Sequence, residues 1–169
     1  MSRVMNLLPI VILYGGPMSL SLFVLVMLML WRNPRLLLQD YPEDVKARVP
    51  PKSQAERRAS VYCGIIFFLL VVAFPFAGAL AARAGSRDFL EIFLAAFGVA
   101  FLFNVVDWLI IDWLIVCTVT PAFVVIPGTA GMAGYKNYGM HFRGFVVGCV
   151  LSVVLGFLIA IIVNQIPHS

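Results

Sequence analysis

Long uncharged apolar runs alternate with short polar segments along the chain, and this pattern predicts four membrane-spanning helices. A hydrocarbon core about 30 Å thick needs about 20 helical residues to cross it. Four runs are long enough, so we expect spans at about residues 4–31, 60–82, 89–118 and 144–163. Two longer connections, at residues 32–59 and 119–143, lie on the same side of the membrane. The sequence therefore predicts an all-α polytopic membrane protein, a single membrane domain built as a bundle of four transmembrane helices.

Proline, glycine and serine residues predict where the helices bend or begin. The first apolar run is too long for an untilted span, and the Gly-Gly-Pro triplet at residues 15–17 predicts a kink or break in its middle. Ser53 followed by Glu56 forms a capping-box pattern, which predicts that the second helix begins before the membrane. The Pro-Glu-Asp sequence at residues 42–44 predicts the start of a short surface helix in the first connection.

The composition excludes a water-soluble domain. Hydrophobic residues make up 62% of the 169 residues and charged residues only 12%, whereas a soluble domain carries about 25% charged residues. The net charge of +4 does not indicate nucleic acid as a partner, because most of the Lys and Arg residues lie in one short stretch beside apolar runs. The partner that this composition predicts is the lipid bilayer. Cys63, Cys117 and Cys149 form no paired motif, so we expect neither a metal site nor a cofactor.

The distribution of Lys and Arg predicts the orientation. Positive residues are retained preferentially on the cytoplasmic side of a membrane. Of the 12 Lys and Arg residues, seven lie in residues 32–59 and two in residues 119–143, which leaves three on the opposite side. We therefore expect a multi-pass protein of the inner (cytoplasmic) membrane, with both connections in the cytoplasm and both termini outside it.

A stripe of small residues predicts the packing face of the fourth span. Burial of apolar side chains gives helices in lipid little drive to associate, so close contact through small residues contributes more. Small residues recur at every fourth position, at Gly144, Gly148, Ser152, Gly156 and Ala160. The second span has a similar stripe at Ala73, Ala77 and Ala81. The two stripes either face each other within one bundle or form the seam of a homo-oligomer.

Polar residues within the third span mark the candidate site. Ionisable groups at membrane depth cost several kcal/mol, so they usually face a protein interior or a water-filled cavity and indicate function. In an α-helix, Asn104 lies about 60° and Asp112 about 140° from Asp107, while Thr118 lies about 20° from it. The tetrad Asp-Trp-Leu-Ile occurs twice here, five residues apart. We expect Asp107 to be the deeper acid and Asp112 to lie near the cytoplasmic boundary, beside tryptophans that favour that level.

The connection at residues 119–143 does not resemble an ordinary linker. It begins with an apolar stretch and continues with glycines between aromatic and basic residues. We expect a structured loop that lies against the third helix or partly re-enters the membrane. Its residues that could pair with the aspartates or bind a ligand are Lys136, His141 and Arg143.

Several motifs follow one another in the last third of the chain. They are Asp-Trp-Leu-Ile at 112–115, Thr-Pro at 120–121, Ile-Pro-Gly-Thr at 126–129, Gly-Tyr-Lys at 134–136 and His-Phe-Arg-Gly-Phe at 141–145. In this order they resemble a group of small uncharacterised bacterial membrane proteins. The resemblance implies a four-span membrane protein and implies no activity. An acid follows the Ile-Pro-Gly-Thr element in that group, whereas this chain has Ala130, so no role is carried over to that position.

Three functions are compatible with these features. The first is a small transporter or channel-type component, in which the polar face around Asp107 binds a proton or cation. The second is a scaffold or assembly subunit, in which Asp107 and Asp112 pair with Lys136 and Arg143. The third is a membrane-embedded enzyme that acts on a lipid at the cytoplasmic leaflet, with an aspartate as base or metal ligand. The sequence favours the first two, because it contains no catalytic motif.

Overall fold

The structure, a computed structural model, describes residues 2–85 and 88–166 and contains no strand over that part of the chain. Four helices are long and apolar enough to cross a membrane. They are α1 (Ser2–Arg32), α3 (Gln54–Gly85), α4 (Phe89–Val106) continued by the π-helix η2 (Asp107–Val119), and α5 (Tyr138–Asn164). The connections contain the short helices η1 (Pro34–Asp40), α2 (Glu43–Arg48) and η3 (Ala133–Lys136). The predicted fold class is confirmed: the protein is an all-α, multi-pass bundle of four membrane helices.

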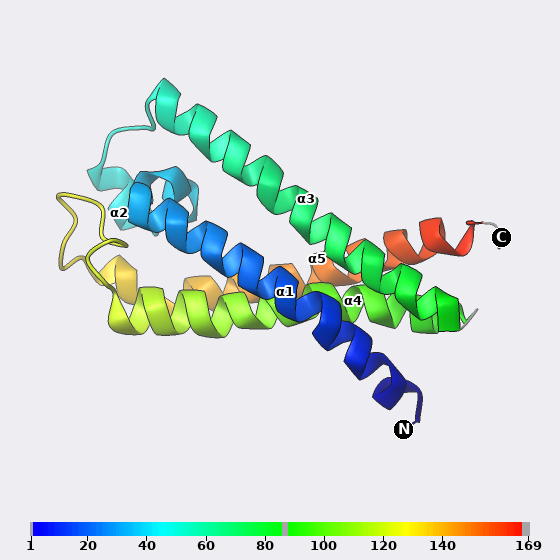
Figure 1. Ribbon diagram of the computed structural model, residues 1–169. Coiled ribbons are helices and arrows are strands. Elements are labelled where there is room, and N and C mark those ends of the chain that lie inside the picture. Colours follow the sequence, from blue (N-terminus) through cyan, green and yellow to red (C-terminus); the bar gives the residue numbers. More distant parts are fainter. Residues whose placement is uncertain (1, 86–87, 167–169) are drawn as a thin grey trace.

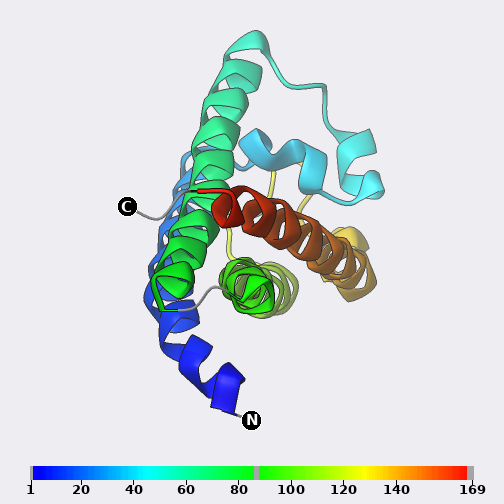
Figure 2. The ribbon, with the colours of Figure 1, turned by 90° about the vertical axis from the view of Figure 1, so that its right-hand side faces the viewer.

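The helix α4 lies at the centre of the bundle and packs against α1, α3 and α5 (Figure 1). Viewed along α4, the helices α1 and α3 lie on one side of it and α5 on another (Figure 2). Glycines allow α1 to approach closely, since a Cβ at Gly15 would lie 2.9 Å from Leu102 Cδ2 and one at Gly98 would lie 2.7 Å from Val11 Cγ2. The helix α1 continues through residues 15–17, so of the predicted kink or break the break is wrong, while the kink stays a prediction. Gly15 serves the contact with α4 instead of ending the helix.

The small-residue stripe of α5 packs against α4 within the same chain. A Cβ at Gly156 would lie 2.9 Å from the backbone nitrogen of Phe97, and one at Gly148 would overlap the side chain of Asn104. Two further members of the stripe are buried, Ser152 and Ala160. The close approach of the α4 backbone therefore depends on glycine at position 156.

The first residue of the α5 stripe and the predicted stripe of α3 do not lie against α4 as Gly148 and Gly156 do. Gly144, the first member of the stripe on α5, has nothing within 4 Å of a Cβ built on it. On α3 the buried small residues are Gly78, Ala79 and Ala82, whereas Ala73 is exposed. The predicted α3 stripe is therefore wrong in register, because the face that approaches α4 is set by Gly78, where a Cβ would lie 3.0 Å from Val99 Cγ2.

The two long connections fold onto each other and cap one end of the bundle (Figure 1). The hydroxyl of Tyr41 donates a 2.6 Å hydrogen bond to the carbonyl of Val124, and the backbone N–H of Ile126 donates to the hydroxyl of Tyr135 at 2.9 Å. The buried apolar cluster of this cap consists of Leu30, Leu38, Tyr41, Val45, Val124, Ile126 and Tyr135. The connection at residues 119–143 is thus a structured loop, as predicted, and it packs on the first connection at the end of the bundle, while its re-entry into the membrane stays a prediction.

Two local predictions for the first connection are also confirmed. The short helix α2 begins at Glu43, directly after Pro42. At the start of α3, the backbone N–H of Ser53 donates to Glu56 Oε2 at 2.8 Å, and the N–H of Glu56 donates to Ser53 Oγ at 3.2 Å, which is the reciprocal pattern of a capping box. Glu56 also forms a 2.7 Å ion pair with Arg35 Nε, so the same side chain joins η1 to the beginning of α3.

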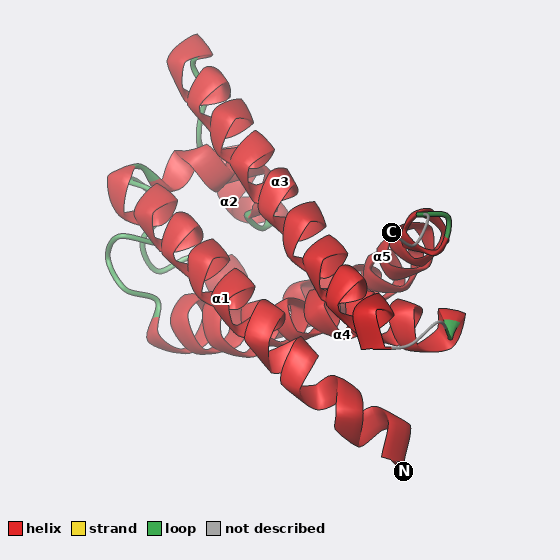
Figure 3. Cartoon of the chain, turned by 45° about the vertical axis from the view of Figure 1, so that its right-hand side comes forward, coloured by secondary structure: helices red, strands yellow, loops and turns green. Residues whose placement is uncertain are grey.

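The helices α3 and α5 touch at the end far from the cap and diverge toward it (Figures 1 and 3). At the touching end, Ala79 packs in one cluster with Ala160 and Val163, and Arg83 Nη1 donates to the carbonyl of Val163 at 2.5 Å. Toward the cap, α3 exposes large apolar side chains: Val61, Tyr62, Ile65, Ile66, Phe68 and Leu69. This divergence leaves room between α3 and α5 beneath the cap.

Candidate functional site

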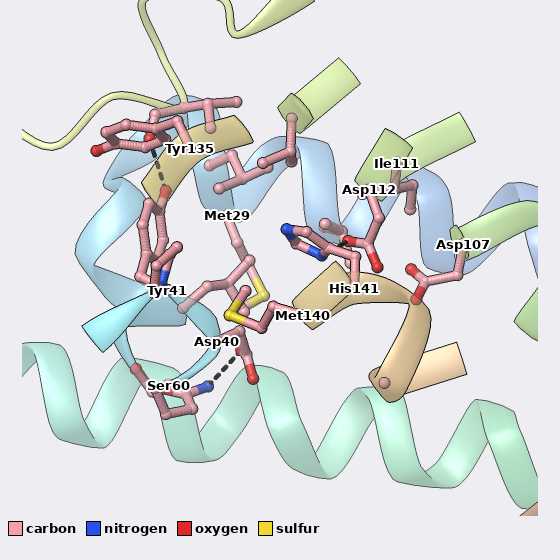
Figure 4. A pocket seen from close by; sticks show the side chains of 18 of the residues that line it. Met29, Asp40, Tyr41, Ser60, Asp107, Ile111, Asp112, Tyr135, Met140 and His141 are labelled. Carbon is pink, nitrogen blue, oxygen red and sulfur yellow. Dashed lines mark hydrogen bonds and ion pairs between the residues drawn. The ribbon is translucent and has the colours of Figure 1, made fainter. Parts of the chain in front are cut away.

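A cavity of about 690 Å³ lies between the diverging helices beneath the cap (Figure 4). Its volume is within the range of about 300–1,000 Å³ that small-molecule sites occupy. Much of its wall is apolar and includes Met29, Leu30, Leu37, Phe67, Ile111, Val116 and Met140. Its polar and ionisable residues include Gln39, Asp40, Glu43, Lys46, Ser60, Asp107, Asp112 and His141. An apolar chamber with a few converging polar groups has the composition of a ligand site.

The π-helix η2 brings Asp107 and Asp112 to the same cavity. In a π-helix each N–H bonds to the carbonyl five residues earlier, as the Thr120 N–H does to the Ile115 carbonyl at 2.8 Å. The predicted angle of about 140° between the aspartates assumed α-helical geometry, which ends at Val106. The five-residue repeat of Asp-Trp-Leu-Ile matches the π spacing, so both aspartates line the cavity. The two tryptophans of the repeat also meet, with ring centroids 4.7 Å apart.

His141 and Asp112 form an ion pair across the cavity wall. The Nδ1 atom of His141 lies 3.0 Å from Asp112 Oδ1, and the two side chains are only 11% and 23% exposed. His141 lies in the first turn of α5, where Asn137 Oδ1 caps the helix by accepting from the Met140 N–H at 3.0 Å. The Nε2 atom of His141 has no hydrogen bond to any described residue, so it can serve a ligand or a proton.

Asp40 reaches the cavity from the opposite side, out of η1 (Figure 4). The Asp40 side chain is exposed to the cavity, but many protein atoms lie around it at longer distance and reduce its hydration. This burial raises the pKa of Asp40 above its ordinary value; Lys52 opposes the rise and Asp112 adds to it. Nearby, Glu43 and Lys46 form a 2.7 Å ion pair with each other. The lining therefore carries four carboxyl groups against one lysine and one histidine.

Four of the predicted site residues lie outside this cavity lining. Asn104 Nδ2 donates to the Phe145 carbonyl at 3.0 Å, so it joins α4 to α5. Thr118 Oγ1 donates to the Trp113 carbonyl at 2.7 Å within η2. Lys136 Nζ donates to the Thr118 carbonyl at 3.0 Å and to Thr120 Oγ1 at 2.7 Å, so it binds the C-terminal end of η2. Arg143 is exposed, and no ion pair of the described residues includes it.

Sequence reasoning missed the part of the site that the first connection supplies. By the hydropathy pattern alone, Asp40 belongs to the polar connection at residues 32–59, and Ser60 only begins the second span. The structure brings them to the cavity because Lys52 Nζ donates to the Leu36 carbonyl at 2.6 Å and to Ser60 Oγ at 2.9 Å, which holds η1 against α3. The available signal was an acid close behind three consecutive leucines, in the sequence Leu-Leu-Leu-Gln-Asp at residues 36–40.

No family model, no curated protein and no solved structure matches the chain. Within residues 2–85 and 88–166, no group of three or more His, Cys, Asp or Glu side chains is arranged to hold a metal ion. A function is assigned by the chemistry of a site and not by the fold that carries it.

Proposed function

We propose that this protein is a small transporter or channel-type component that binds a proton or cation at Asp107 and Asp112. The observation that carries this proposal is that two acids from a membrane-spanning segment share one ligand-sized cavity. Carboxyl groups at membrane depth are costly and are characteristic of ion pathways and proton relays. His141, whose Nδ1 lies 3.0 Å from Asp112 Oδ1, supports this function because an imidazole ring can both accept and donate a proton.

The charge of the lining argues against the lipid enzyme. That alternative needs basic residues at an anionic head group, and Lys136 and Arg143 do not line the cavity. The lysine that does line it, Lys46, is already paired with Glu43. An anionic head group would therefore meet mainly carboxylates, which repel it.

The ion pairs of the described residues do not support the scaffold alternative. It requires Asp107 and Asp112 to pair with Lys136 and Arg143, but the partner of Asp112 is His141. Lys136 is engaged instead at the end of η2, where Thr118 and Thr120 accept its hydrogen bonds. A purely structural role also gives no reason for an open, acidic cavity beside these residues.

The proposal includes an orientation in the inner membrane. Nine of the 12 Lys and Arg residues belong to the connections that form the cap, or to the helix ends that adjoin them. This concentration supports a cytoplasmic cap with both termini outside. A C-terminal tag should then be protected from protease in inside-out vesicles, and a cleaved tag would contradict the orientation.

We also propose that any homo-oligomer forms through the outer face of α5. The small-residue stripe is already covered by α4, so a second copy would meet the exposed residues Val146, Val150, Val153 and Phe157. Val150→Cys should then cross-link two copies in the membrane. Absence of a cross-linked dimer would exclude this seam.

The test of the function is cation movement in proteoliposomes. An inside-negative potential should drive uptake of protons or of ²²Na⁺ into vesicles that contain the protein. We expect Asp107→Asn and Asp112→Asn each to reduce this flux by about tenfold or more, since each removes an ionisable carboxyl group from the cavity.

The matched control is Asp88→Asn, which removes a carboxylate from the other end of the same span. Asp88 caps α4 by accepting from the Leu90 N–H at 2.9 Å, and asparagine keeps such a cap. We expect this variant to retain wild-type flux. Flux no greater than in empty vesicles, or an Asp107→Asn variant as active as the wild type, would overturn the proposed function.

A further inference from the structure

We propose that the ligand of this cavity is an amphipathic organic cation, with one positive charge on an apolar body, and that it enters sideways from the membrane between α3 and α5. The inference rests on the proposed function, because it names the substrate class of the same site. Three features carry it: the chemistry of the walls, the position of the opening and the polar rim at the cap.

The walls combine apolar surface with carboxyl groups that belong to no ion pair of the described residues. Asp107 and Asp40 reach the cavity from different elements, η2 and η1, and neither has a basic side chain within ion-pair distance among the described residues (Figure 4). Met29 and Met140 lie between them (Figure 4), and Phe67 also lines the cavity. Methionine is polarizable and adapts to irregular ligands, and an aromatic face attracts a cation. An apolar body with a single positive charge satisfies both kinds of surface.

The opening toward lipid is bordered by one glycine on each of the two diverging helices. Gly64 of α3 and Gly144 of α5 both line the cavity and are both exposed. Nothing lies within 4 Å of a Cβ built on either of them. Both belong to membrane-spanning helices. The cavity therefore extends to exposed backbone on both helices, at two positions where the space for a side chain is free.

A second part of the cavity reaches the polar end of the molecule. Gln39, Asp40 and Glu43 also line it and are exposed, and they belong to the cap. One chamber thus connects the lipid-facing side with the polar cap. Amphipathic cations concentrate at this depth of a bilayer, with the apolar body in the acyl region and the charge near the head groups. They would meet the opening directly.

The charge requirement is tested with two probes of the same shape. Tetraphenylphosphonium and tetraphenylborate are nearly isosteric and differ in the sign of their charge. With the full-length protein in nanodiscs of uncharged lipid, we expect saturable binding of tetraphenylphosphonium and none of tetraphenylborate. Asp107→Asn should weaken tetraphenylphosphonium binding by about tenfold or more. Choline, a cation without an apolar body, should bind at least about tenfold more weakly than tetraphenylphosphonium.

The route is tested by closing the opening. Gly64→Phe and Gly144→Phe each place a ring where the backbone now has free space, so we expect tetraphenylphosphonium to associate about fivefold or more slowly. The controls Ile66→Phe and Val150→Phe add the same ring to exposed positions that do not line the cavity, and they should bind at the wild-type rate.

The outcomes separate this inference from the proposed function. Equal binding of the two probes, or wild-type association rates in both glycine variants, would overturn the inference even if vesicles still take up protons or ²²Na⁺. Charge-selective binding without any flux would instead support the ligand class and overturn the transport function.

Discussion

The hydroxyl of Tyr41 donates a 2.6 Å hydrogen bond to the backbone carbonyl of Val124, 83 residues further along the chain. Both groups are buried, and the ring of Tyr41 packs edge-on against Tyr135 at 6.0 Å. This bond joins the first connection to the second, and the cavity lies directly beneath their junction. The stability of the site therefore depends on the contact between the first and second connections.

Tyr41→Phe should destabilise the protein, because it leaves the Val124 carbonyl buried without its partner. We expect a loss of about 1–3 kcal/mol in the free energy of unfolding, measured by chemical denaturation in detergent. The control is Tyr62→Phe, whose side chain is 67% exposed, and we expect no change from it. Equal stability of Tyr41→Phe and the wild type would show that the bond contributes nothing to the cap.

The glycines of α5 should tolerate alanine very unequally. Gly156→Ala places a Cβ 2.9 Å from the Phe97 backbone nitrogen, and a backbone cannot move aside as a flexible side chain can. Overpacking of this kind costs about 1–3 kcal/mol. Gly144→Ala meets nothing within 4 Å and should be neutral or slightly stabilising, since alanine favours the helix. Thermal unfolding of both variants checks the order, and a larger loss in Gly144→Ala than in Gly156→Ala would contradict this packing of α4 on α5.

Asp40 should make stability depend on pH in a defined direction. Its pKa is raised by burial, with Lys52 opposing the rise and Asp112 adding to it. A raised pKa means that the folded state favours the protonated acid. The resulting stabilisation is complete below the unfolded pKa, which is about 3.9, and is lost as the pH rises through the folded pKa. The side chain of the Asp40→Asn variant cannot ionise. The difference between the Tm of this variant and the Tm of the wild type should therefore increase in favour of the variant as the pH rises.

That comparison is made from pH 4 to pH 8 by thermal unfolding in detergent. The charged groups that act on Asp40 include Lys52, Asp112 from η2 and Lys46 from α2, and all are retained in the variant. Asp88→Asn, measured in parallel, controls for loss of one negative charge. A constant difference in Tm between Asp40→Asn and the wild type over this range would exclude the assigned direction.

Hydropathy predicts the helices of this protein well, because a membrane imposes one length and one composition on every span. It also singles out Asp107 and Asp112, since charge at membrane depth is rare, whereas His141 is a candidate because of its place in the second connection. The remaining geometry depends on two features that periodicity does not encode. The π-helix changes the angular relation of residues within η2, so both aspartates line the cavity and Thr118 does not. The folding of one connection onto the other brings Asp40 to the site and keeps Lys136 away from it.

The cap also constrains how the protein can be assembled. Tyr41 and Val45 are among its buried residues, but the residues that cover them, Val124, Ile126 and Tyr135, emerge from the ribosome only after the third span. Until then, a chain with two inserted spans presents an uncovered apolar patch in the first loop. A chain truncated after the second helix would therefore be a target for chaperones and proteases, and the intact chain completes its biogenesis only when its second loop arrives.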